Sequence, residues 1–220
     1  RIIEISYSRK LSHLGSCLTA VDIIDEIFKI KKPNEKFVLS SGHAGLALYC
    51  VLEKQLEDNC IACNDANQSI PIYRTTHSCR RPTAEEMFKH HGVHPDYCKE
   101  CVIDCTSGSL GHGLPIAVGM ALANRSKNVY CLISDGECSE GSIWEAFRII
   151  QEYKLWNLKV YVNFNGWGAY KKINGLGLLP PIGLNIQTTN VEQLPFLKGQ
   201  DAHYKVMNEE EYALALQILK

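Results

Sequence analysis

The chain has 220 residues, of which 45% are hydrophobic, so it can bury the core of one domain. Its formal net charge of −1 gives no electrostatic reason to expect nucleic acid or an anionic membrane surface as a partner. No apolar run approaches the ~20 residues that span a bilayer. Residues 1–6 contain neither a secretory leader nor Met. We therefore expect a cytoplasmic protein whose observed chain begins inside the encoded one.

The first predicted elements are two helices. Residues 17–30 place apolar side chains on one helical face, with Ser16 as the expected N-cap. Residues 44–55 predict the second helix. Residues 58–104 are rich in Cys, Asn, His and Pro and are expected to be irregular.

One short helix is expected within this irregular part. Thr83 and Glu86 have the spacing of a capping box, in which two side chains pair with backbone N–H groups at the start of a helix. Gly92 can end the same helix, because glycine readily takes the left-handed backbone conformation.

The same region holds two Cys-x2-Cys pairs, Cys60/Cys63 and Cys98/Cys101. This spacing occurs in tetrahedral zinc sites. However, the two pairs lie far apart, and residues 101–105 resemble a strand that leads into a glycine-rich loop. We therefore expect ordinary thiols, with zinc as the alternative. A disulfide framework is not expected in a chain of this size without an export signal.

A glycine-rich loop with Gly108, Gly111 and Gly113 precedes a predicted helix of small residues at 114–124. Glycines let the backbone approach a ligand closely, and the start of the helix offers free N–H groups to phosphate. A flexible strand–helix connection is the alternative interpretation.

Residues 128–165 predict a strand, a helix and a second strand. The first strand, 128–134, ends at Asp135, and the second, 158–163, leads to Asn165. Cofactors bind at the carboxyl edge of parallel sheets. A carboxylate and an amide oxygen at that edge suit Mg²⁺ with a bound diphosphate. An Asp-Gly turn and a strand-ending Asn are the alternative.

Asn208 is expected to cap a last helix with Tyr212, Leu216 and Leu219 facing inward. Strands that alternate with helices predict an α/β fold, a doubly wound parallel sheet with helices on both faces.

Several of these segments resemble the motifs of transketolases. Asp135-Gly136-x3-Glu140-Gly141-x2-Trp144, followed by Asn163-x-Asn165, is similar to the family's thiamine diphosphate signature. Five further segments follow the family's order. Four are histidine motifs, at 12–16, 37–44, 92–95 and 201–204, and the fifth is the glycine loop at 106–113. The resemblance extends from about residue 10 to the C-terminus.

The resemblance implies a site for thiamine diphosphate and Mg²⁺. It assigns the metal to Asp135, Asn165 and the carbonyl of Trp167, and it places Gly136 against the diphosphate, with Glu137 also among the cofactor-binding residues. Ser134 stands where many family members have Gly. Because this position ends a strand, we expect the change to matter little.

In the glycine loop, the resemblance places Gly108, Ser109 and Leu110 at the aminopyrimidine side of the cofactor. His112 replaces a frequent Gln of the family, and we expect this polar substitute to be tolerated.

The resemblance also separates four histidines from the rest. It implies that His13, His43, His94 and His203 cluster over the thiazolium ring and handle substrate hydroxyls and protons, with His203 nearer the diphosphate. A near-neutral pKa suits histidine to both tasks. Glu140 is implied to join a carboxylate network between active sites.

The implied function is ketol transfer, the movement of a two-carbon unit between sugar phosphates as in the pentose phosphate reactions. Complete transketolases carry a second, pyrimidine-binding domain with the glutamate that activates the cofactor, and a third domain. Nothing in this sequence matches them. We therefore expect residues 1–220 to form one domain, the N-terminal subunit of a split transketolase. Its expected partner is a pyrimidine-domain chain, within a heterotetramer.

Three alternatives remain open from the sequence. The chain could be a fragment of a longer enzyme. It could serve another thiamine diphosphate reaction, such as 1-deoxyxylulose-5-phosphate synthesis or 2-oxoacid decarboxylation. It could also be a non-catalytic regulatory subunit that keeps the fold, although such a subunit would not need Asp135, Asn165, His43 and His94.

Overall fold

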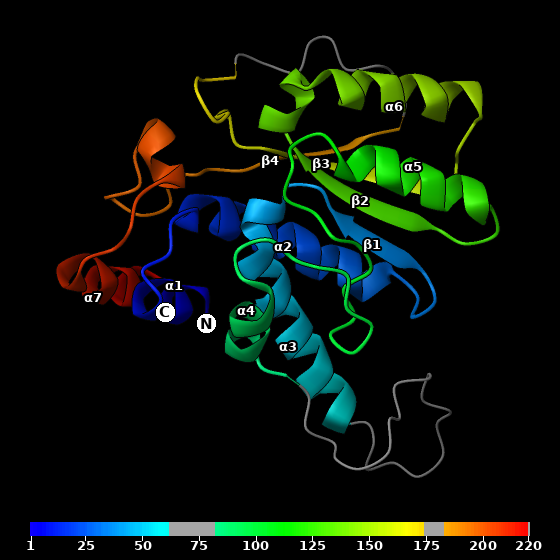
Figure 1. Ribbon diagram of the computed structural model, residues 1–220. Coiled ribbons are helices and arrows are strands. Elements are labelled where there is room, and N and C mark those ends of the chain that lie inside the picture. Colours follow the sequence, from blue (N-terminus) through cyan, green and yellow to red (C-terminus); the bar gives the residue numbers. More distant parts are fainter. Residues whose placement is uncertain (62–81, 174–182, 220) are drawn as a thin grey trace.

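A four-stranded parallel sheet lies at the centre of the protein (Figure 1). The structure, a computed structural model, describes residues 1–61, 82–173 and 183–219, with only the backbone of 56–61. The strands lie side by side in chain order, and all neighbours are parallel: β1 (Lys36–Leu39), β2 (Val129–Ser134), β3 (Leu158–Phe164) and β4 (Asn185–Thr188).

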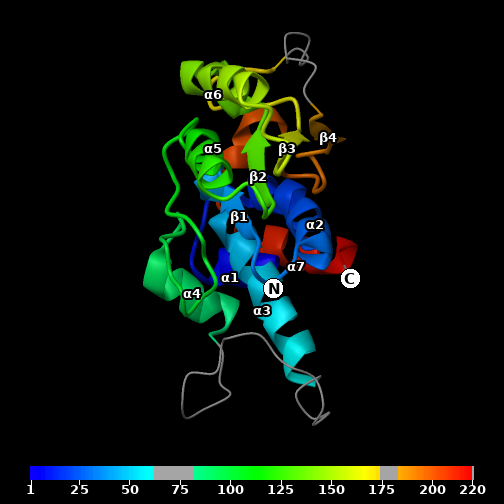
Figure 2. The same cartoon turned by 90° about the vertical axis from the view of Figure 1, so that its right-hand side faces the viewer.

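Helices cover both faces of the sheet, which confirms the predicted fold class. On one side lie α2 (Leu14–Ile30) and α3 (Gly45–Ile61), and on the other lie α5 (Gly113–Ala123) and α6 (Gly141–Glu152). Figure 2 shows α2 and α5 on opposite sides of the strands.

The strand sequences explain the two-sided packing, because successive side chains of a strand point to opposite faces. Phe37 and Leu39 of β1 belong to the hydrophobic cluster that includes α2 and α3, whereas Val38 belongs to the cluster of α5 and α6. In β2, Leu132 joins the first cluster and Ile133 the second.

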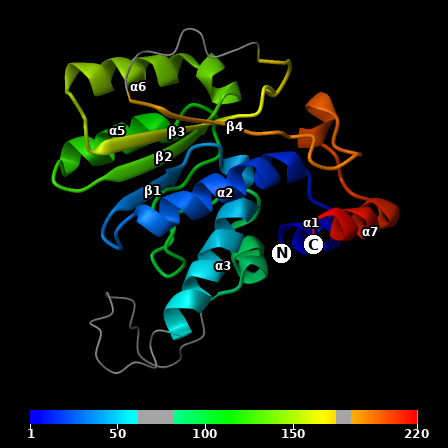
Figure 3. The ribbon, with the colours of Figure 1, turned by 180° about the vertical axis from the view of Figure 1, so that it is seen from behind.

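Two short helices bring the first and last parts of the described chain into contact. α1 (Ile2–Ser8) packs beside α7 (Glu209–Ile218) (Figure 3). The rings of Tyr7 and Tyr212 stack with their centroids 4.2 Å apart. The described connections also contain short 3-10 helices: η1 (Gly42–Ala44), η3 (Gly136–Ser139) and η4 (Gly199–His203).

The predicted capping box at Thr83 and the predicted cap at Asn208 are both confirmed. α4 (Ala84–His91) begins with reciprocal hydrogen bonds between Thr83 and Glu86 and ends at Gly92, whose φ is 75°. Asn208 forms the same arrangement at the start of α7. Tyr212 and Leu216 pack against the core as expected, but Leu219 is 43% exposed.

Two further sequence expectations are wrong. The N-cap of the first long helix is His13 and not Ser16, so the helix begins three residues earlier than predicted. Residues 101–105 form no strand. Instead, Cys98 and Ile103 make an isolated antiparallel bridge around a tight turn, in which Val102 has a φ of 61°. Within the described part of the chain, no helix is both long and apolar enough to cross a membrane.

Candidate functional site

A pocket of about 210 Å³ lies at the carboxyl edge of the sheet. The segments that follow β1, β2 and β3 all reach it, because parallel strands end at the same edge. Residues from α2, the glycine loop and η4 complete its walls. Nine of the residues singled out from the sequence line this one pocket: His13, His43, His94, Gly108, Leu110, Gly136, Asn165, Trp167 and His203.

Three of the four motif histidines form a direct cluster. The ring centroid of His43 is 5.1 Å from that of His13 and 6.5 Å from that of His203. The backbone N–H of His13 donates to the carbonyl of His203 at 2.6 Å, and Ser16 Oγ is hydrogen-bonded to His203 Nδ1 at 2.7 Å. His13 has a left-handed backbone, with a φ of 63°. Such a conformation is unusual for a residue other than glycine and often marks a functional site.

The surroundings keep these imidazoles neutral near pH 7. Burial, with smaller contributions from the neighbouring histidines His13, His203 and His94, lowers the pKa of His43 to about 3. Burial also lowers the pKa of His13 and that of His203, although the nearby backbone of Trp167 raises the latter somewhat. A neutral imidazole can accept a proton at one nitrogen and donate at the other.

Two buried histidine nitrogens lack a hydrogen-bond partner among the described residues, His13 Nδ1 and His203 Nε2. Unpaired buried polar atoms are uncommon, because they lose their hydrogen bonds to water without replacement. Since both rings line the pocket, a polar ligand there could supply the missing partners.

The glycine loop contacts the histidine segments directly. A Cβ atom on Gly108, whose φ is 151°, would lie 3.0 Å from Cγ of His94. A Cβ atom on Gly42 would lie 2.7 Å from the backbone nitrogen of Gly108, which is closer than atoms can pack. The loop is also held by the backbone N–H of Ser107, which donates to the carbonyl of Pro95 at 3.0 Å. These close contacts hold the loop in place beside His94, and its residues Gly108 and Leu110 line the pocket.

Asp135 and Asn165 are joined through the loop that follows β3. Asp135 is fully buried, and its carboxylate accepts the N–H groups of Gly166 at 2.7 Å and Gly136 at 3.0 Å. Asn165 Oδ1 accepts the N–H of Trp167 at 2.9 Å. Burial raises the pKa of Asp135 more than these backbone hydrogen bonds lower it, and the result is a pKa of about 6.

The oxygen atoms of Asp135 and Asn165 suit Mg²⁺, the cation that the sequence motifs imply. A buried carboxylate is costly to ionise unless positive charge compensates it. Both oxygens of Asp135 and the Asn165 amide oxygen keep lone pairs for a further partner. Carboxylate, amide and carbonyl oxygens are ligands that Mg²⁺ accepts.

Glu137 lies beneath the pocket and does not line it. Its carboxylate accepts the hydroxyl of Ser40 at 2.6 Å and the N–H groups of Gly111 at 2.9 Å and Ser134 at 3.0 Å. Burial raises its pKa, and these donors partly offset that shift. Glu137 thus ties the ends of β1 and β2 to the glycine loop. The hydroxyl of Ser134 also bonds to Glu137, which gives this departure from the family pattern a local role.

The remaining predicted residues lie outside the pocket. Asp135 is buried behind it, whereas Ser109 and Glu140 are exposed and do not line it. The structure adds pocket residues that the sequence reasoning did not assign, among them Ser16 and Asn163. Asn163 was visible in the Asn-x-Asn motif, but nothing in the sequence indicated that Ser16 would bond to His203.

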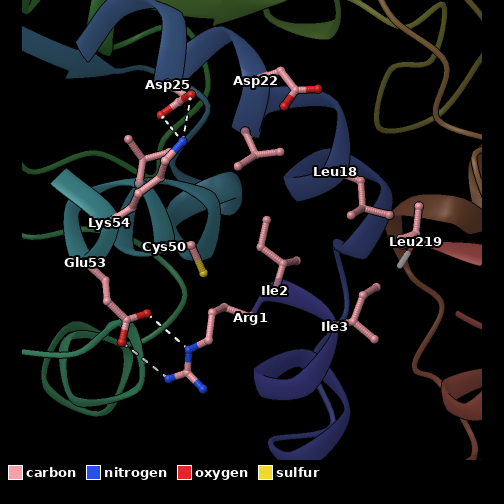
Figure 4. A pocket seen from close by; sticks show the side chains of 12 residues that line it. Arg1, Ile2, Ile3, Leu18, Asp22, Asp25, Cys50, Glu53, Lys54 and Leu219 are labelled. Carbon is pink, nitrogen blue, oxygen red and sulfur yellow. Dashed lines mark hydrogen bonds and ion pairs between the residues drawn. The ribbon is translucent and has the colours of Figure 1, made fainter. Parts of the chain in front are cut away.

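A larger pocket, of about 530 Å³, lies between α1, α2 and α3 (Figure 4). Its charged side chains largely pair with one another: Arg1 with Glu53 at 3.1 Å, and Lys54 with Asp25 at 3.1 Å. It contains none of the motif residues. The smaller pocket is therefore the candidate site.

A histidine-lined pocket at the carboxyl edge of a parallel sheet, backed by a buried carboxylate and a glycine loop, defines a cofactor-binding α/β domain. Comparison with known proteins agrees. Residues 10–168 match the family described as transketolase, thiamine diphosphate binding domain. The chain belongs to this family.

Named relatives fall into two groups. Human transketolase is 33% identical over 171 residues, which cover 71% of this chain and 24% of that protein. The chain thus spans about a quarter of the length of such relatives. The second group consists of proteins named as one subunit of an apulose-4-phosphate transketolase. The one from Phocaeicola vulgatus is 31% identical over 75% of this chain and 57% of its own length. The one from Actinobacillus succinogenes is 26% identical over 94% and 87%.

The fold also matches a solved structure. The transketolase of Campylobacter jejuni aligns with a TM-score of 0.53 and 22% identity, over 83% of this chain and 29% of that one. This similarity supports the fold.

Proposed function

We propose that this chain is the diphosphate-binding subunit of a split transketolase, which transfers a two-carbon ketol unit between sugar phosphates with thiamine diphosphate and Mg²⁺. The observation that carries the proposal is the convergence of motif histidines, the glycine loop and the Asp135–Asn165 loop on one pocket. Family membership supports the cofactor. The names of the two apulose-4-phosphate transketolase relatives, each given as one subunit, support the division into two chains.

Asp135, Asn165 and the Trp167 carbonyl would hold Mg²⁺, and Gly136 would lie against the diphosphate. The buried carboxylate of Asp135 then has a compensating positive charge. When bound, thiamine diphosphate supplies a thiazolium ring that accepts the electron pair left on the two-carbon unit as the ketose C–C bond breaks.

The histidines would handle the substrate. His13, His43 and His203 are held neutral by burial, so all three can form hydrogen bonds to sugar hydroxyls. The unpaired nitrogens of His13 and His203 would also exchange protons with the substrate. His94 is exposed and packs on Gly108, which places it at the mouth of the pocket, where a sugar phosphate enters.

A second chain would complete the site. The pocket, at about 210 Å³, is smaller than the roughly 300–1,000 Å³ typical of complete small-molecule sites. Glu140 is exposed, as a residue that meets a carboxylate of another subunit must be before assembly. α5 also exposes Ile116 and Leu122, and α6 exposes Trp144, which suits an apolar contact surface.

The test is reconstitution. The purified chain alone should show no ketol transfer, and addition of a pyrimidine-domain chain encoded beside it should restore transfer that depends on thiamine diphosphate and Mg²⁺. A matched control is Asp135→Ala, which should assemble with the partner but remain inactive. Ketol transfer by the 220-residue chain alone would refute the split-subunit proposal. Decarboxylation of a 2-oxoacid by the assembled enzyme, without ketol transfer, would favour that alternative chemistry.

A further inference from the structure

A group of three metal-ligating side chains lies away from the cofactor pocket. Nε2 of His91 and the sulfurs of Cys98 and Cys101 all lie within 4.8 Å of one another. His91 is the last residue of α4, and the two cysteines belong to the tight turn that follows. None of the three lines the cofactor pocket. The sequence pointed to ordinary thiols because the two Cys-x2-Cys pairs were far apart, and nothing in it indicated that His91 would join one of them.

The tight turn between Cys98 and Ile103 holds the sulfurs of Cys98 and Cys101 close together. Cys98 and Ile103 exchange both backbone hydrogen bonds, at 3.0 and 2.9 Å, and Val102 has the left-handed conformation that closes the turn. The N–H of Cys101 donates to Sγ of Cys98 at 3.3 Å. A backbone N–H directed at a sulfur favours its thiolate form, and the thiolate is the form that binds metal.

The spacing suits a tetrahedral ion. Zn–S bonds of about 2.3 Å and Zn–N bonds of about 2.0–2.1 Å place neighbouring ligand atoms roughly 3.5–3.8 Å apart. His91 Nε2 is 3.4 Å from Cys101 Sγ, and all pairs of the group are within 4.8 Å. Small side-chain rotations therefore suffice. Cys101 is 7% exposed and His91 and Cys98 are half-buried, so the group is largely shielded yet reachable from solvent.

We propose that His91, Cys98 and Cys101 bind one Zn²⁺, with the fourth position taken by water or by the carboxylate of Glu100. Oε2 of Glu100 lies 3.6 Å from Sγ of Cys98, on the exposed side of the group. Two thiolates neutralise the charge of the ion, and a thiolate–imidazole set selects zinc over Mg²⁺ or Ca²⁺. The Cys-x2-Cys spacing is the one that structural zinc sites use.

The ion would brace one wall of the cofactor pocket. His91 and Cys98 lie on either side of the segment that carries His94. The same segment is tied to the glycine loop by the N–H of Tyr97, which donates to Thr106 Oγ1 at 2.8 Å, and by the N–H of Ser107, which donates to Pro95. A bond from each end of the segment to one ion would fix His94 relative to that loop.

The first test is metal content. The full chain, expressed in zinc-supplemented medium and purified under reducing conditions, should contain about one Zn²⁺ per chain by mass spectrometry of the elements. His91→Asn and the double variant Cys98→Ser, Cys101→Ser should lose it. Cys50→Ser and His90→Asn are matched controls outside the group and should retain it. Zinc that survives in the double variant, or a wild type that contains no zinc, would overturn the proposal.

Two measurements on the wild type guard against variants that fail to fold. X-ray absorption at the zinc edge should show two sulfur neighbours, with nitrogen and oxygen as the rest. Four sulfur neighbours would exclude His91 as a ligand and overturn the proposal. Removal of the zinc by a chelator should speed hydrogen exchange at the amides of Tyr97 and Ser107 while the amides of β2 keep their protection. Unchanged exchange at both amides would contradict the bracing role.

Discussion

The low pKa of His43 should make the protein sensitive to mild acid. Its pKa is about 3 in the folded state, compared with the ordinary value of 6.5 for histidine. Between these two values the unfolded chain binds the proton more readily than the folded one. The contribution of His43 to stability is therefore complete above pH 6.5 and is lost progressively as the pH falls towards 3.

The magnitude follows from the two pKa values. At pH 5 the unfolded state gains about 2 kcal/mol from protonation of this ring, whereas at pH 8 it gains almost nothing. This is an upper value, because the edge of the ring that lines the pocket keeps some contact with solvent. Asp135 and Glu137 have raised pKa values, so their contribution to stability increases as the pH falls, opposite to that of His43. Both residues are present in the wild type and in the His43 variant, so their effect cancels when the two proteins are compared.

The assay is urea unfolding, followed by circular dichroism at pH 8 and pH 5, for the wild type, His43→Gln and His112→Gln. Glutamine keeps a polar side chain but does not titrate. Between pH 8 and pH 5 the wild type should lose about 2 kcal/mol more than His43→Gln, or about 1 M in urea midpoint. His112 is exposed and outside the pocket, so its variant should follow the wild type. Equal losses in the wild type and His43→Gln would refute the reasoning.

Three further predictions concern the site. Asp135→Ala should weaken Mg²⁺-dependent binding of thiamine diphosphate by the assembled enzyme at least about tenfold, or about 1.4 kcal/mol, by calorimetry; normal affinity would reject the metal assignment. His94→Ala should lower turnover by about 10² with nearly unchanged cofactor affinity, because it removes substrate positioning and proton transfer; normal kcat would make His94 structural. Glu137→Ala should lower the free energy of unfolding by about 3 kcal/mol, since it leaves three buried donors unpaired. Glu137→Gln keeps one acceptor oxygen and should cost less, so equal losses would count against the network.

The sequence predicted those parts of the fold that local physics determines. The box at Thr83 and the cap at Asn208 were predictable because each depends on residues within four positions of one another. The strand that ends at Ser134 was predictable from its continuous apolar run. β4 carries no such signal, because its side chains are mostly exposed.

The features that the sequence did not predict depend on contacts between residues that are not neighbours in the chain. Ser16 has the side chain of an N-cap, but its hydroxyl bonds to His203, 187 positions away, and the helix begins at His13 instead. Nor could local periodicity place His91 beside Cys101, since that contact depends on the turn around Val102. The resemblance to family motifs identified most of the predicted site residues that line the pocket. Only the structure showed that Glu137 is buried and does not line it.

The bond between Ser16 and His203 also bears on the order of events during synthesis. The three strands whose ends form the floor of the pocket are complete by Phe164, so a growing chain can pair them while its last part is still within the ribosome. The wall built from η4 cannot form until residue 203 has emerged. Because contacts between distant positions form slowly, the histidine cluster closes late. A nascent chain stalled before this point would therefore have paired strands beside an incomplete pocket, in which His13 and Ser16 lack their contacts to His203.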